Sequence, residues 1–248
     1  MLYDTILFDL GGTLIDYRGS VSDWPSMERI GMAAVHTLLN GNGHKPPTLE
    51  AFQETCFANL KDAWYAAVRG ERNLVLSDLL QESLASHGVH CDHTLLEQAV
   101  QGYTTAISAG ARPQDGAREL LQALSTSGRR LGLISNTMWP PAAHIADLRR
   151  FELYPFFEEL VFSAERGVWK PDPQVFDLAM RAVKGRPERT VYVGDNPHDD
   201  ILGARRAGIR SIWIRTDEYP PDAGREADAI VDHLLEIPEV LARWEAES

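Results

Sequence analysis

An acidic residue, Asp9, stands near the end of the apolar run Thr5–Leu10 and is followed by Gly11, Gly12 and Thr13. Glycine leaves the backbone free to turn sharply, so a carboxylate placed here can be exposed to a ligand. An exposed carboxylate at such a turn is suited to act as a nucleophile. Ordinary strand-to-loop turns share this pattern, so Asp9 needs partners elsewhere in the chain to carry out chemistry.

A hydroxyl and a lysine in the second half of the chain are candidates for these partners. Ser135-Asn136-Thr137 ends a second apolar run, where a hydroxyl and neighbouring backbone amides could bind a phosphoryl oxygen. Lys170 precedes a Pro-Asp-Pro segment, and its ammonium would neutralise charge shared by a nucleophile and a phosphoryl group. Taken alone, the first segment also fits a helix N-cap, and the second fits a surface lysine before a helix.

A further group of acids follows the apolar run Val191–Gly194. Asp195 comes directly after this run, and Asp199 and Asp200 come at the predicted start of a helix. Magnesium prefers hard oxygen ligands from one or two carboxylates, together with substrate phosphate and water. Asp195 is therefore the better ligand candidate, and Asp199 and Asp200 compete for the second position. The other acid would be favoured at the helix start by the helix dipole.

Short apolar runs with β character recur along the chain, with helical patterns between them. They are Thr5–Leu10, Arg130–Ser135, Leu160–Ser163, Thr190–Gly194, Ser211–Ile214 and Ala229–Val231. Strands that alternate with amphipathic helices predict a parallel sheet covered on both faces. We therefore expect an α/β fold with a doubly wound, Rossmann-like parallel sheet as its core. Such a sheet binds ligands beyond the carboxyl ends of its strands, where Asp9, Ser135 and Asp195 all fall.

The pattern changes between residues 17 and 109, where runs with β character give way to helical stretches. These stretches are Met27–Leu39, Leu49–Arg69, Leu74–His87 and Leu95–Ala109. The sequence therefore predicts a helical domain at 17–109, inserted into an α/β core made of 1–16 and 110–248.

Taken in this order and spacing, the segments around Asp9, Ser135, Lys170 and Asp195 resemble the four motifs of the haloacid dehalogenase-like (HAD) hydrolase superfamily. Members of this superfamily mostly transfer phosphoryl groups through an aspartyl phosphate, with magnesium as cofactor. The resemblance implies that Asp9 is the nucleophile and that Ser135 and Lys170 are catalytic. It also implies that the helical insertion is a cap domain, hinged to close over the site.

The resemblance implies further site residues. Substrate would be bound by Gly12, Thr13 and Asn136. Magnesium would be held by Asp9, the backbone carbonyl of Gly11, Asp195 and Asp200. The second acid of the last motif falls four or five positions after the first in this superfamily, and the segment Asp200-Ile201-Leu202-Gly203-Ala204 favours Asp200 over Asp199.

One residue of the family pattern is missing. Phosphatases of the superfamily usually carry a second Asp two positions after the nucleophile, and here that position is Gly11. In the family this Asp protonates the leaving group and then activates water, and such an acid or base is typically worth about 10²–10⁴-fold in rate. Its loss predicts a preference for good leaving groups, a surrogate acid, or no turnover. Asp16 is the first surrogate candidate, and His144 and His198 are weaker ones.

The resulting expectation is a magnesium-dependent hydrolase of a small phosphorylated metabolite that acts through an aspartyl phosphate and favours good leaving groups. Two alternatives stay open. A 2-haloacid dehalogenase uses the same nucleophile on carbon and needs no leaving-group acid, which suits Gly11, but it needs no magnesium, and Asp195 belongs to a segment that resembles an intact metal site. A non-catalytic relative that acts as a binding protein is the other alternative.

Composition limits the partners. The formal net charge of −12 over 248 residues argues against nucleic acid, because nucleic-acid binding normally shows a basic footprint. No run approaches the roughly 18 apolar residues that span a bilayer, so we expect no membrane partner. The two cysteines, Cys56 and Cys91, fit a reducing compartment, and we expect a cytoplasmic location. The sequence leaves the oligomeric state open.

Overall fold

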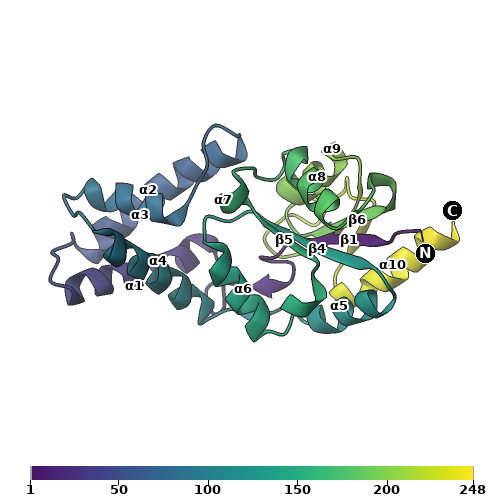
Figure 1. Ribbon diagram of the computed structural model, residues 1–248, viewed down its shortest axis with the longest axis horizontal. Coiled ribbons are helices and arrows are strands. Elements are labelled where there is room, and N and C mark those ends of the chain that lie inside the picture. Colours follow the sequence, from purple (N-terminus) through teal and green to yellow (C-terminus); the bar gives the residue numbers. More distant parts are fainter. Residues whose placement is uncertain (1, 248) are drawn as a thin grey trace. The chain divides into compact units, whose positions relative to one another are not determined.

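A six-stranded parallel sheet forms the centre of one of the two units into which the chain divides (Figure 1). The computed structural model describes residues 2–247. The first unit, here called the core unit, comprises Met1–Asp16, Pro113–Asn136 and Leu148–Ser248. The second, here called the helical unit, comprises Tyr17–Arg112 and Thr137–Asp147.

The strands of the core unit follow the order β5-β4-β1-β6-β7-β8 across the sheet. Their bounds are β1 (Thr5–Phe8), β4 (Arg130–Ser135), β5 (Glu159–Phe162), β6 (Thr190–Gly194), β7 (Arg210–Ile214) and β8 (Ala229–Val231). All six were predicted from the apolar runs, with ends that differ by at most two residues. Phe8 pairs with Leu133 on one side and with Val193 on the other. The segments that follow β1, β4 and β6 therefore leave the sheet at the same edge.

Helices cover both faces of this sheet. The helix α8 (Pro173–Ala182) packs on β1, β4 and β5, whereas α5 (Ala117–Thr126) packs against β4 and against α10 (Ile237–Ala246). Figure 1 shows α8 and α9 (Gly203–Arg206) on one side of the strands and α5 and α10 on the other. This arrangement confirms the predicted α/β, doubly wound architecture.

A buried apolar cluster holds α8 to the sheet. The side chains of one sheet face and of the helix meet in it, among them Leu7, Ile134, Val161, Val175, Phe176 and Tyr192. Burying a side chain of this size contributes about 1.5–3 kcal/mol. The helix begins where predicted, because Pro173 suits a first turn and the Asp172 carboxylate accepts a hydrogen bond from the backbone N–H of Gln174 at 2.9 Å. This packing fixes the segment that carries Lys170.

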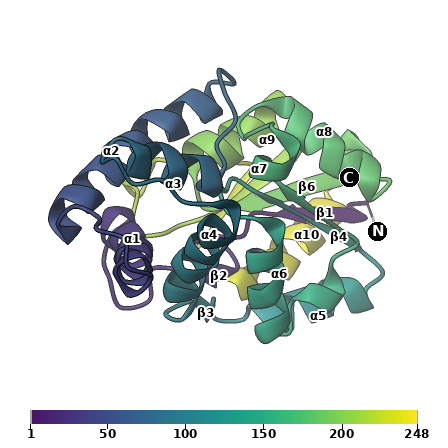
Figure 2. The same cartoon turned by 60° about the vertical axis from the view of Figure 1, so that its left-hand side comes forward.

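The helical unit contains α1 (Trp24–Gly41), α2 (Leu49–Val68), α3 (Leu76–Ala85) and α4 (His93–Ser108), which pack against one another in sequence order, with α1 also packed on α4 (Figure 2). Side chains cap three of the helix starts: Asp23, Thr48 and Asp92 each accept a hydrogen bond from a backbone N–H of the first turn. Among the described residues, no helix combines the length and the apolar character needed to cross a bilayer.

The bounds of the units differ from the predicted 17–109 and 110–248. Two short strands, β2 (Ile15–Asp16) and β3 (Arg112–Pro113), lie where the chain passes between the units. The helical unit also takes in Thr137–Asp147, which includes the start of α6 (Pro141–Arg150), a helix that the sequence pattern did not predict. The role of the helical unit as a cap stays a prediction.

Candidate active site

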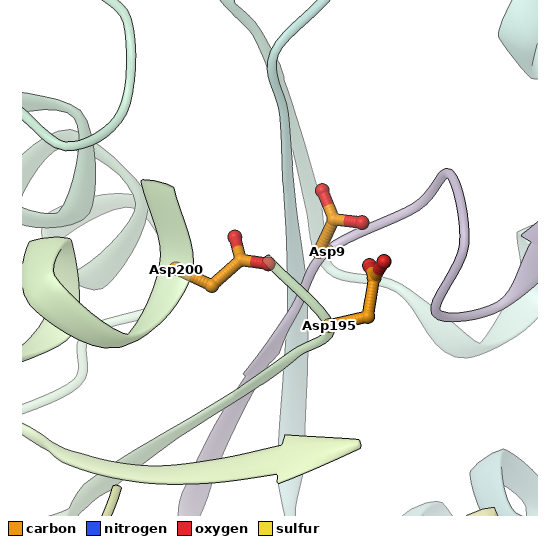
Figure 3. Close-up of side chains that lie close together, drawn as sticks. All are labelled: Asp9, Asp195 and Asp200. Carbon is orange, nitrogen blue, oxygen red and sulfur yellow. The ribbon is translucent and has the colours of Figure 1, made fainter. Parts of the chain in front are cut away.

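Three carboxylates converge at the carboxyl edge of the sheet (Figure 3). Asp9 follows β1, Asp195 follows β6, and Asp200 belongs to η3 (Pro197–Leu202), the wide helical turn after β6. Each side chain offers an oxygen that lies within 4.8 Å of the others, and all three are buried. Figure 3 shows the carboxyl groups pointing toward one another. We call these residues the carboxylate cluster.

A buried lysine lies within bonding distance of the carboxylate cluster. The ammonium of Lys170 donates to Oδ1 of Asp9 at 2.6 Å, to Oδ1 of Asp200 at 2.7 Å and to the hydroxyl of Tyr192 at 2.9 Å. Burial alone would lower the pKa of Lys170, but Asp200 and Asp9 outweigh it and hold this pKa above its ordinary value. Lys170 is therefore a charged, buried partner of two carboxylates and not a surface lysine.

The electrostatics of the carboxylate cluster favour a cation. Burial raises the pKa of Asp9 to about 6, with Lys170 acting to lower it and Asp200 to raise it. Burial, followed by the charges of Asp9 and Asp200, raises the pKa of Asp195 well above its ordinary value. When all three carboxyl groups are ionised, one ammonium leaves an excess of negative charge, which a divalent cation would balance. Carboxylate oxygens are the ligands that hard divalent cations prefer, so this cluster could hold such a metal.

The turn after β1 contacts Asp195 closely. The hydroxyl of Thr13 donates to Oδ1 of Asp195 at 2.9 Å. Gly12 has φ 90, and a Cβ at this position would lie 2.5 Å from Oδ2 of Asp195, so both the backbone and the space require glycine. Gly11 is exposed. Substrate binding by Gly12 and Thr13 and metal binding by the Gly11 carbonyl stay predictions.

The side chain of Asn136 connects three of the sequence motifs. Its Oδ1 accepts from the backbone N–H of Lys170 at 2.8 Å, and its Nδ2 donates to the Lys170 carbonyl at 2.9 Å and to Oδ2 of Asp199 at 3.1 Å. Ser135, predicted to be catalytic, is buried at the end of β4. The contacts of Asn136 give it a bridging role, and its role in substrate binding stays a prediction.

The two competing acids of η3 have different surroundings. Asp200 lies in the carboxylate cluster, whereas Asp199 contacts Nδ1 of His198 at 2.8 Å and the amide of Asn136. The hydrogen bond with Asp199 raises the pKa of His198 above its ordinary value, more than burial lowers it. The structure therefore brings Asp200, and not Asp199, together with Asp9 and Asp195, and the metal-ligand role of Asp200 stays a prediction.

The other predicted surrogate acids lie in different surroundings. Asp16 is half-buried on β2, outside the carboxylate cluster. His144 is buried in the helical unit, with Nδ1 at 3.0 Å from the hydroxyl of Tyr17 and Nε2 at 2.7 Å from the hydroxyl of Thr137. Burial lowers the pKa of His144 to about 3. A general acid must carry its proton at the working pH, so His144 is unsuited to replace the missing Asp.

Sequence reasoning missed two aromatic residues whose polar atoms reach this site. The hydroxyl of Tyr192 lies 3.0 Å from Oδ1 of Asp200, and the indole N–H of Trp213 donates to the backbone carbonyl of Asp195 at 2.7 Å. Both side chains are fully buried. A buried Tyr or Trp needs a hydrogen-bond partner for its polar atom. A Tyr or Trp within an otherwise apolar strand was therefore the signal that could have identified these two residues.

A family model and two known phosphatases match this chain. A family model described as haloacid dehalogenase-like hydrolase matches residues 3–208. A glyceraldehyde 3-phosphate phosphatase of Pyrococcus furiosus is 29% identical over 182 residues, which cover 68% of this chain and 75% of that protein. A phosphoglycolate phosphatase of Caulobacter vibrioides is 27% identical over 241 residues, which cover 94% of this chain and 89% of that protein.

A solved structure of a 2-haloacid dehalogenase from Pseudomonas syringae is also similar. It matches this chain with a TM-score of 0.73 and 27% sequence identity, over 98% of this chain and 99% of that one. Proteins named for two different activities are therefore similar to this chain.

Proposed function

Because this chain belongs to the haloacid dehalogenase-like hydrolase family, we propose that it is a magnesium-dependent phosphatase of small phosphorylated metabolites. The observation that carries the proposal is the buried carboxylate cluster with Lys170 bonded to two of its members. The phosphatases of Pyrococcus furiosus and Caulobacter vibrioides support the reaction class, since both are named for small phosphorylated substrates.

In the proposed reaction, Asp9 is the nucleophile. Its Oδ1 accepts a hydrogen bond from Lys170, so we assign the attack on phosphorus to Oδ2. The attack forms an aspartyl phosphate, and the substrate oxygen departs. Lys170 balances the charge of Asp9 and of the phosphoryl group. Ser135 and Asn136, with the backbone amides beside them, and the Gly12-Thr13 turn bind the phosphoryl oxygens. Water then hydrolyses the aspartyl phosphate, which restores the Asp9 carboxylate and releases inorganic phosphate.

Asp9, Asp195, Asp200 and the backbone carbonyl of Gly11 are the proposed ligands of Mg²⁺. The bound ion would supply positive charge that stabilises the phosphoryl oxygens in the transition state. The chemistry of the donor set fits this ion, because it consists of three buried carboxylates and one backbone carbonyl, all of them oxygen ligands.

The glycine at position 11 shapes the proposed substrate range. No carboxylate at this position protonates the leaving group, so substrates whose leaving group departs unprotonated are favoured. Acyl phosphates, phosphoanhydrides, aryl phosphates and sugar 1-phosphates are of this kind. We propose that the helical unit selects among them as a cap, and that the protein acts in the cytoplasm.

A 2-haloacid dehalogenase is the second candidate, favoured by the likeness to the Pseudomonas syringae enzyme. In that reaction Asp9 would attack carbon and displace halide, and Gly11 would be no handicap. The carboxylate cluster argues against it, because a reaction without metal has no need for three converging buried carboxylates. A non-catalytic binding protein is the third candidate.

One experiment separates the three candidates. Purified protein is incubated with p-nitrophenyl phosphate and, separately, with 2-chloropropionate, each with Mg²⁺ and with EDTA. We expect release of phosphate that depends on Mg²⁺ and no release of chloride. Chloride release that is insensitive to EDTA would establish the dehalogenase, and absence of both products would favour the binding protein. A panel of phosphorylated metabolites under the same conditions then identifies the substrate.

A further inference from the structure

One peptide group, between Asp195 and Asn196, is hydrogen-bonded at both of its polar atoms. Its carbonyl oxygen accepts from Nε1 of Trp213 at 2.7 Å, and its N–H donates to Oδ2 of Asp200 at 2.8 Å. A peptide group is planar, so both bonds act on one rigid unit. This unit therefore connects Trp213 to two of the three members of the carboxylate cluster.

The indole of Trp213 is held firmly in place. Its side chain has an exposed fraction of 0%, and its backbone pairs with Gly194, the residue before Asp195. Gly224 lies against the ring, so closely that a Cβ at this position would be 2.0 Å from Cδ2 of Trp213. Gly224 therefore has to be glycine for packing reasons, and the indole has no room to turn away from the Asp195 carbonyl.

The side chain of Asp195 is fixed from its other end by Thr13, whose hydroxyl donates to Oδ1 at 2.9 Å. With the carbonyl fixed by Trp213 and the carboxylate fixed by Thr13, the direction of the Asp195 side chain is set at two points. The Asp200 carboxylate is set by the Asn196 N–H and by Lys170 in the same way.

We propose that Trp213 is a positioning residue for the metal site, and that its indole N–H orients the Asp195–Asn196 peptide so that both carboxylates face one divalent cation. This inference rests on the proposed function, because it concerns the metal site of that function. Groups that orient metal ligands change metal affinity by about 10–100-fold when they are removed. A loosened peptide would leave Asp195 and Asp200 free to adopt directions that no longer converge.

The test removes the N–H while keeping the shape of the side chain. Trp213 is replaced by benzothienylalanine, a tryptophan isostere that has sulfur in place of the indole N–H. Trp213→Phe is a second variant that uses only natural residues. The matched control is Trp244→Phe, which shortens another buried tryptophan of the core unit, on α10. Circular dichroism and thermal unfolding confirm that each variant is folded.

Metal binding is measured without substrate, by electron paramagnetic resonance of Mn²⁺, which counts the free ion. We expect the isostere to raise the Kd for Mn²⁺ at least about tenfold, and Trp244→Phe to leave it unchanged. In the activity assay, the Mg²⁺ concentration for half-maximal rate should rise by the same factor, while kcat at saturating Mg²⁺ is preserved. A purely structural role of Trp213 would lower the thermal stability and kcat without this selective shift.

Two outcomes would overturn the inference, and they are distinguishable. If the unmodified protein binds Mn²⁺ and the isostere binds it equally well, Trp213 does not position the ligands, and the proposed function stands. If the unmodified protein binds no Mn²⁺ at millimolar concentrations, both the proposed metal dependence and the inference about Trp213 are wrong.

Discussion

Oδ1 of Asp9 accepts a hydrogen bond from the ammonium of Lys170 at 2.6 Å, and both side chains are buried. The ammonium offsets part of the cost of burying the carboxylate, which burial alone would push toward its protonated form. The pair therefore keeps a nucleophile available in a largely water-excluded position.

Replacing Asp9 by Asn should abolish turnover and keep the fold. The amide oxygen of Asn can still accept the Lys170 hydrogen bond, but an amide cannot form the covalent phosphoenzyme. We expect the rate with p-nitrophenyl phosphate to fall by at least about 10³-fold. Asp177→Asn, at an exposed position of α8, is the control and should have unchanged activity. Substantial activity in folded Asp9→Asn protein would show that Asp9 is not the nucleophile.

Replacing Tyr192 by Phe should lower kcat by about tenfold. The hydroxyl of Tyr192 is one of three groups that the Lys170 ammonium contacts, at 2.9 Å, and its loss lets the ammonium shift away from Asp9. A lost hydrogen bond to a charged group costs about 1.5–3 kcal/mol. Steady-state kinetics at saturating Mg²⁺ measure the effect. An unchanged kcat would mean that Asp9 and Asp200 alone fix Lys170.

Replacing Gly11 by Asp should broaden the range of leaving groups. In the unmodified protein the rate should fall steeply as the pKa of the leaving group rises, because the leaving group departs unprotonated. The new carboxylate can donate that proton, so turnover of alkyl phosphates relative to aryl phosphates should rise by about 10²-fold. Gly11 is exposed, so a side chain has access to solvent.

The measurement for Gly11→Asp is a rate series across alkyl and aryl phosphates. Gly41→Asp is the control, because a side chain at that position meets no neighbour within 4 Å. A flat series in the unmodified protein would reveal an acid already in place, and Asp16→Asn should then make the series steep.

The stability of the helical unit should depend on pH through Glu28. This residue is buried on α1, where Tyr103 of α4 donates a hydrogen bond to it. Burial raises the pKa of Glu28 from its ordinary value of 4.5 to about 7, although hydrogen bonds from Tyr103 and Trp24 act to lower it. Below pH 4.5 the Glu28 carboxyl is protonated in both the folded and the unfolded state, so its contribution to the stability of the fold is complete. This contribution is lost as the pH rises through 7.

The loss linked to Glu28 should be on the order of 3 kcal/mol in the free energy of unfolding. Glu28→Gln carries no charge in either the folded or the unfolded state. In urea denaturation, the free energy of unfolding of this variant should therefore rise relative to that of the unmodified protein between pH 4.5 and pH 8. Glu54→Gln, at an exposed position of α2, should follow the unmodified protein at every pH. Parallel pH profiles for Glu28→Gln and the unmodified protein would show that Glu28 is already ionised in the fold.

The strands could be predicted from sequence because a parallel sheet covered on both faces needs continuous apolar runs, and β4, β6 and β8 begin and end at the predicted residues. The helix α6 was missed because its segment is polar and begins at the second of two consecutive prolines, Pro140 and Pro141. Its first residues belong to the helical unit through contacts with Tyr17, which no local pattern records.

The candidate site could be predicted where its residues end strands or begin helices. Asp9, Lys170, Asp195 and Asp200 meet as the motif order implied. Tyr192 and Trp213 escaped prediction because their polar atoms form hydrogen bonds with Asp200 and Asp195, on segments that only the fold brings beside them. An apolar pattern identifies such residues as core, and only the three-dimensional structure shows where their polar atoms point.

The cluster of Tyr17 and His144 has a consequence for protein engineering. Its two members are 127 positions apart, and Trp139 stacks on the His144 ring at 5.0 Å between centroids. On the ribosome, the helical unit therefore stays incomplete until the chain after β4 has emerged. A chimera that exchanges only Tyr17–Arg112 with a related enzyme would combine half of this cluster with a foreign partner. Modular transplantation of the helical unit must carry Thr137–Asp147 as well.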